Sequence, residues 1–185
     1  MTARSRRTAL FDFDGTLVDS DAALVAPFAA LGVAEADRPP LGLPLGDACA
    51  RVGITVDDYL AHYDPTAAQP FPGVEAMLAR LGRWGLCSNK DLATGERELA
   101  RLGWAPTVAL FSEAFGGRTK RLGPLLDALG LAPGAAVFVG DTDHDRAAAG
   151  DAGVAFALAG WNARARPAPG DRVLSTPAAV LDLLT

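Results

Sequence analysis

Residues 9–17 read Ala9-Leu10-Phe11-Asp12-Phe13-Asp14-Gly15-Thr16-Leu17. The apolar run at 9–13 is typical of a short buried strand, which Gly15 and Thr16 then end. Because strand side chains alternate with a period of two, Asp12 and Asp14 point the same way at the end of this strand. Two ionised carboxylates in that position need a counter-charge, and a hard divalent cation is the simplest one, although Asp-x-Asp-Gly is also an ordinary turn sequence.

The composition narrows the class of protein. The 185 residues suffice for one core, or for one core plus a small inserted module. A net charge of -5 argues against a nucleic-acid surface, and no apolar run approaches the ~20 residues that span a bilayer. The basic start at 1–7 leads directly into a strand with two aspartates, which makes it a poor signal peptide. Two cysteines without framework spacing favour a reducing cytoplasm, so we expect a cytoplasmic protein.

Beyond residue 70 the pattern alternates between strands and helices. This order predicts an α/β fold, a doubly wound parallel sheet with helices on both faces. The expected strands are 9–13, 84–87, 108–111, 135–139, 154–158 and 173–174, and the expected helices are 74–81, 93–102, 122–129, 146–152 and 177–184. Between the first two strands, three short helical segments lie among Pro- and Gly-rich stretches. Residues 18–70 are therefore expected to form a separate helical block.

The polar residues with chemical potential follow the expected strand ends. Asp12 and Asp14 follow the first strand, and three further groups occupy comparable positions: Ser88 with Asn89, Asp141 with Asp145, and Lys120 before a helix. In open parallel sheets, ligands bind beyond the carboxyl ends of the strands. The sequence therefore predicts one site built from these side chains.

In this order, the four groups resemble the signatures of haloacid dehalogenase-like (HAD) phosphohydrolases. The first is the 12–17 stretch, the second is the strand that ends at Ser88, the third is Lys120, and the fourth is Gly140-Asp141 with Asp145. The resemblance implies a Rossmann-like core formed by residues 1–17 and 71–185, with residues 18–70 as a short helical C1-type cap. The stretches 87–90, 139–142 and 147–153 resemble the phosphoglycolate phosphatase-like branch, and 42–45 resembles the substrate-facing turn of its cap. The lysine loop departs from that branch, where Lys-Pro is more usual than Lys120-Arg121.

The resemblance also implies a role for each carboxylate. Asp12 would be the nucleophile that forms an aspartyl-phosphate, and ionisation at neutral pH suits that role. Asp14 would act as general acid and then general base, while its backbone carbonyl touches the metal. Asp141 would complete a Mg²⁺ site with Asp12 and Asp14, and Asp145 would be a further ligand or the support of one, although Asp145 could simply cap the helix that follows it.

Other residues would neutralise and orient the phosphate. Lys120 would supply a positive charge and Ser88 a hydroxyl, and backbone N–H groups near Gly15 and Asn89 would donate hydrogen bonds. Arg51 is a candidate for binding a carboxylate or second phosphate of the substrate, together with Arg38, the other arginine of the cap. For Lys90 the residues alone leave a functional and a structural role equally open.

Four functions remain to be separated. The favoured one is a Mg²⁺-dependent phosphatase acting on a small phosphorylated metabolite, as a monomer or homodimer. The alternative is a phosphomutase of the β-phosphoglucomutase kind, which would interconvert sugar phosphates without net phosphate release. A dehalogenase would leave Asp14, Asp141 and Asp145 without a role. A non-catalytic binding module of the same fold would release no phosphate from an aryl phosphate.

Overall fold

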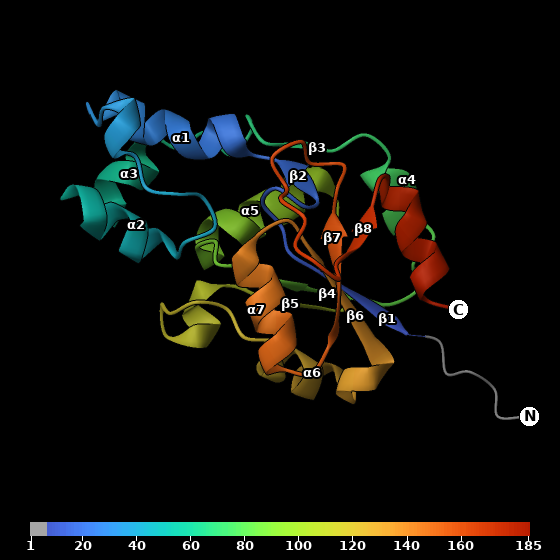
Figure 1. Cartoon of the computed structure of the whole chain (residues 1–185). Helices are drawn as coiled ribbons and strands as arrows, with labels where there is room; N and C mark the ends of the chain where they lie inside the picture. The colour runs from blue at the N-terminus through green and yellow to red at the C-terminus, as the bar shows by residue number, and fades with distance from the viewer. Residues whose placement is uncertain (1–6) are drawn as a thin grey trace, which may run out of the picture.

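The computed structural model describes residues 7–185, and it is built on a six-stranded sheet with strand order β5-β4-β1-β6-β7-β8 (Figure 1). Each neighbouring pair in it is parallel, so the predicted α/β class is confirmed. The strands are β1 (Thr8–Phe11), β4 (Trp84–Cys87), β5 (Val108–Leu110), β6 (Ala136–Gly140), β7 (Ala155–Ala159) and β8 (Arg172–Leu174). Residues 1–6, which include most of the basic start that makes a poor signal peptide and the beginning of the expected 1–17 core segment, lie outside the described part.

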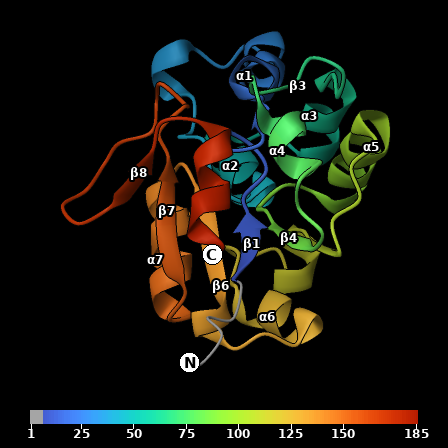
Figure 2. The same cartoon turned by 90° about the vertical axis from the view of Figure 1, so that its right-hand side faces the viewer.

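Helices cover both faces of this sheet (Figure 2). Alternation along β1 explains why: Ala9 and Phe11 belong to one apolar cluster and Leu10 to another on the opposite face. The first cluster is completed by α4 (Val74–Leu78), α5 (Leu92–Leu102) and the 3₁₀ helix η4 (Pro177–Leu183), and the second by α6 (Gly123–Leu129) and α7 (Asp143–Asp151). β1, which is buried from Ala9 to Phe11, thus ends between two helical layers, which fixes the position of the residues that follow it.

Residues 18–70 leave and rejoin the sheet at a two-stranded antiparallel pair, β2 (Val18–Asp19) and β3 (Gln69–Pro70). This inserted segment carries α1 (Asp21–Ala30), α2 (Leu45–Val52) and α3 (Val56–His62). Its helices pack on a small core of their own, formed by Phe28, Ala48, Cys49 and Tyr59. In Figure 1 they lie together beyond one end of the sheet.

Several element boundaries differ from the sequence prediction. α4 ends at Leu78 rather than residue 81, because i→i−3 turns replace the α-helical bonds over residues 77–81. The last helix is a 3₁₀ helix. α7 starts three residues earlier than predicted, because Thr142 and Asp145 form a capping box there. Over residues 7–185, no helix combines the length and apolar character that crossing a bilayer requires.

Candidate active site

Four separate loops meet at one pocket. Its lining includes Asp12 after β1, Ser88 after β4, Asp141 after β6 and Lys120 before α6. The parallel strands explain the convergence, since their carboxyl ends share one edge of the sheet. The structure therefore brings together side chains up to 129 residues apart in the chain, from Asp12 to Asp141.

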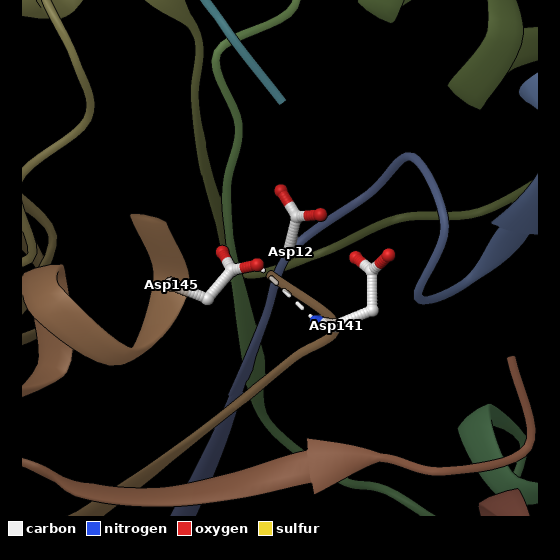
Figure 3. Close-up of side chains that lie close together, drawn as sticks. All are labelled: Asp12, Asp141 and Asp145. Carbon is white, nitrogen blue, oxygen red and sulfur yellow. Dashed lines mark hydrogen bonds between the residues drawn. The ribbon is translucent and has the colours of Figure 1, made fainter. Parts of the chain in front are cut away.

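The carboxylates of Asp12, Asp141 and Asp145 form a buried cluster (Figure 3). One oxygen from each lies within 4.8 Å of the others. The Lys120 ammonium pairs with Asp12 and lies 2.6 Å from Asp145 Oδ1, an oxygen that accepts no hydrogen bond within the described residues. Three carboxylates facing one ammonium leave an excess of negative charge among hard oxygen donors. This donor set fits a divalent cation such as Mg²⁺.

The electrostatics of the cluster follow from its burial. Burial raises the pKa of Asp141 to about 7, and the neighbouring Asp145 adds to the shift. The pKa of Asp12 is raised for the same reason, although Lys120 opposes the shift. For Lys120, burial alone would lower the pKa, but Asp12 and Asp145 raise it above the ordinary value, so its ammonium stays charged at neutral pH. The cluster is therefore short of positive charge.

Asp141 is held in place by two hydrogen bonds. Thr16 Oγ1 donates to Oδ1 at 3.2 Å, and Asn162 Nδ2 donates to Oδ2 at 3.0 Å. Asn162 also reaches the Gly15 carbonyl at 2.9 Å, so it ties the first loop to the loop after β6. Asn162 belongs to none of the four motifs and was therefore not predicted from the sequence.

Gly15 lies beside this cluster but does not line the pocket. Its φ of +79° is in the left-handed region, and a Cβ there would collide with the Asp141 carboxylate. Its own N–H donates to Val18 O at 2.8 Å, within the loop. The N–H of Gly15 itself is therefore engaged within the loop, and the close approach to Asp141 explains why this residue is a glycine.

Asp145 caps its helix, α7, and one of its oxygens is left over for the cluster. Its Oδ2 accepts hydrogen bonds from the Thr142 N–H at 2.9 Å and from Thr142 Oγ1 at 2.6 Å, which caps α7. Its Oδ1 faces Lys120. The capping bonds fix the carboxylate, so that its second oxygen is directed at the cluster.

Asp14 is turned away from the three-carboxylate cluster. Lys90 Nζ lies 2.8 Å from Asp14 Oδ1 and 3.2 Å from Glu98 Oε1. The Tyr63 hydroxyl, from the inserted segment, donates to Glu98 at 2.5 Å and accepts from Lys90 at 3.1 Å. The ion pairs make Lys90 part of the site, a role that the sequence left open. Glu98 was missed, because no local pattern marks it and its full burial becomes visible only in the structure.

The remaining predicted residues divide between pocket and surface. Ser88 is buried and lines the pocket, with its Oγ accepting the Lys90 N–H at 3.2 Å. The Asn89 side chain donates to Gly42 O and accepts from the Lys120 N–H, both at 2.7 Å, so it joins the inserted segment to the lysine loop. Arg51 is exposed on α2 and is not brought to the pocket.

Arg38 likewise does not line the pocket. The arginine at its rim is Arg164, from the loop after β7, which pairs with Asp21. Arg164 was not predicted from the sequence, because nothing local distinguishes it in an arginine-rich loop.

Comparison with known proteins gives a consistent picture. The family model described as haloacid dehalogenase-like hydrolase matches residues 9–159. A phosphoglycolate phosphatase of Xanthomonas campestris pv. campestris (strain 8004) is 32% identical over 191 residues, which cover 87% of this chain and 86% of that protein.

Solved structures share the fold at lower identity. A putative phosphoglycolate phosphatase from Lactobacillus plantarum is 22% identical with a TM-score of 0.74, covering 97% of this chain and 99% of the other. A predicted phosphatase from Clostridium acetobutylicum is 16% identical with a TM-score of 0.78, covering 96% and 97%. With the family match spanning most of the sequence, this chain belongs to the haloacid dehalogenase-like hydrolase family and is an enzyme of its phosphatase class.

Proposed function

We propose that this protein is a Mg²⁺-dependent phosphatase that hydrolyses a small phosphorylated metabolite in the cytoplasm through an aspartyl-phosphate on Asp12. One observation carries the proposal: a buried carboxylate pairs with a buried ammonium beside two further carboxylates, at the floor of a pocket. A nucleophile and a positive charge for the phosphoryl oxygens are thereby adjacent.

In the first step, an Asp12 carboxylate oxygen attacks phosphorus in line, and the bond from phosphorus to the leaving oxygen breaks. Asp14 gives that oxygen a proton, so the leaving group departs as an alcohol. In the second step, Asp14 takes a proton from water as the water attacks phosphorus, which releases inorganic phosphate and restores Asp12. Lys120 and the Ser88 hydroxyl stabilise the charge on the transferring group.

The metal would be held by Asp12, Asp141 and the Asp14 carbonyl, with Asp145 as a further ligand or as the support of Lys120. When bound, Mg²⁺ would neutralise charge on the phosphoryl group. We further propose that residues 18–70 act as a cap over the core formed by 1–17 and 71–185, because their helices supply one side of the pocket.

Phosphomutase activity is the second candidate. It would require a second phosphate to be held in the pocket, and Arg51, the predicted partner of that group, lies outside it. The names of the curated relatives make phosphoglycolate the first compound to test.

The test is inorganic phosphate release by the purified protein, with Mg²⁺ or with EDTA, from phosphoglycolate, sugar phosphates, nucleotides and simple alkyl phosphates. We expect Mg²⁺-dependent release that D12N abolishes, while D127N, which changes an exposed aspartate on α6, retains it. Release that survives D12N would refute the nucleophile. Interconversion of sugar phosphates without net release would support the mutase instead.

A further inference from the structure

The pocket extends well beyond the phosphate end. Its lining runs from Asp12 and Lys120 at that end to Leu24 and Phe28 in the inserted segment. The side that the inserted segment contributes is mainly apolar and includes Leu24, Phe28, Leu41, Leu43, Leu45 and Tyr59. The leaving group of a bound phosphate ester would occupy this part.

The polar side chains that the inserted segment brings to the pocket are already paired. It contributes three polar side chains to the lining: Asp21, Tyr59 and Tyr63. Tyr59 donates its hydroxyl hydrogen to Leu24 O at 2.8 Å, and Tyr63 donates to Glu98 at 2.5 Å. Asp21 is bound to Arg164. This side of the pocket therefore offers a ligand no free side-chain donor.

The cations of the pocket are likewise neutralised. Its lining holds three of them, and Lys120 belongs to the phosphate end. Lys90 is held between Asp14 and Glu98, and Arg164 is paired with Asp21. A second negative charge on the ligand would therefore meet no cation that lacks an acidic partner among the side chains that line the pocket.

We propose that the substrate is a phosphate monoester with an uncharged, largely apolar leaving group, and that the pocket discriminates against carboxylate-bearing esters such as phosphoglycolate. This inference rests on the proposed phosphatase function. A carboxylate placed among apolar side chains without a donor loses its hydration uncompensated. Each methylene buried there gains about fourfold in affinity. The preference for an apolar leaving group thus follows from the cost of dehydrating the carboxylate and from the gain of burying apolar carbon.

Two phosphonates of the same shape measure this preference as binding affinity alone, because neither has an ester bond to hydrolyse. Isopentylphosphonate carries two methyl groups where phosphonopropionate carries the two carboxylate oxygens, and neither can be hydrolysed. Calorimetry on the Mg²⁺-loaded full chain should show isopentylphosphonate binding at least about tenfold more tightly. Equal affinity, or tighter binding of phosphonopropionate, would overturn the inference.

Variants at Leu43 locate the effect. L43R adds a cation to the apolar side and should narrow or reverse the preference, whereas L43M keeps its size and apolar character and should preserve it. L92R provides the matched surface control, because Leu92 is 39% exposed and does not line the pocket. If L92R shifted the preference as much as L43R, the assignment to this pocket would be wrong.

Steady-state kinetics on two esters distinguishes the proposed phosphatase function from the proposed substrate class. With Mg²⁺, isobutyl phosphate should be hydrolysed with a higher kcat/KM than phosphoglycolate, its analogue in shape. A higher kcat/KM for phosphoglycolate would refute the substrate class and leave the phosphatase intact. Failure to hydrolyse either ester, or any other of the panel, would refute the phosphatase and the substrate class with it.

Discussion

At the scale of single residues, the proposed role of Asp14 as proton donor can be tested directly. Its carboxylate is partly exposed at the pocket and bound by Lys90, which places it apart from the Asp12 cluster. If Asp14 is the proton donor, D14N should lower kcat for an alkyl phosphate by ~10²–10⁴-fold. An ester whose leaving group needs no proton, such as p-nitrophenyl phosphate, should lose much less in its first step. Burst kinetics on both esters checks this, and equal losses would remove the acid role.

Asp141 makes the stability of the metal-free protein depend on pH. Its pKa is about 7 in the folded state, against 3.8 as the ordinary value. Between these values the folded protein binds more protons than the unfolded chain, so the free energy of unfolding should fall as pH rises from about 5 to about 7, by at most ~1.4 kcal/mol per pH unit. Denaturant unfolding in EDTA measures this slope. D141N should flatten it, and an unchanged slope in D141N would assign the effect to other groups.

The site residues that the sequence predicts are positioned by local structure, whereas those that it misses are positioned by long-range packing. Asp12, Lys120 and Asp141 stand at strand ends or beside a helix start, where local pattern indicates both position and chemistry. Asn162, Glu98 and Arg164 reach the site through packing between distant segments, and no local pattern marks them. Arg51 shows the converse limit: the sequence indicates its helix, but not that its side chain is exposed outside the pocket.

At the scale of elements, α5 depends on a close contact at Gly95. A Cβ there would collide with the Phe111 ring, whereas at Gly150 in α7 it would meet nothing within 4 Å. G150A should stabilise the protein by about 0.5–1 kcal/mol through helix propensity. G95A should destabilise it by about 1–3 kcal/mol, because overpacking outweighs that gain. Chemical denaturation of both variants checks the opposite signs, and stabilisation by G95A would show that the ring moves aside freely.

The elements themselves follow the sequence pattern where they are long or fully buried. β1, β6 and α5 are close to their predicted ranges because apolar periodicity defines them. The pair β2 and β3 has two residues in each strand, too few to show any period. Their pairing depends on the closure of the whole inserted segment, which is a long-range property.

At the scale of the whole molecule, Tyr63 connects the inserted segment to the core. Its hydroxyl bonds Glu98 on α5 and Lys90, whereas the Tyr59 hydroxyl bonds Leu24 inside the inserted segment. Y63F leaves the buried Glu98 short of a donor and should cost about 1–3 kcal/mol.

Hydrogen exchange separates the two tyrosines. Y63F should speed exchange in both α3 and α5, and the matched control Y59F should speed it in α1 and α3 alone. If Y63F left α5 unchanged, the link between the two parts would not run through this hydroxyl.

The most direct test of the account is chemical trapping of the phosphorylated residue. Acid quenching during turnover, followed by borohydride reduction, converts an aspartyl-phosphate into homoserine, and tandem mass spectrometry of the peptide around residues 9–17 locates the change. The account predicts homoserine at position 12, with Asp14 unmodified. Phosphate release with Asp12 unmodified, or homoserine at position 14, would contradict it.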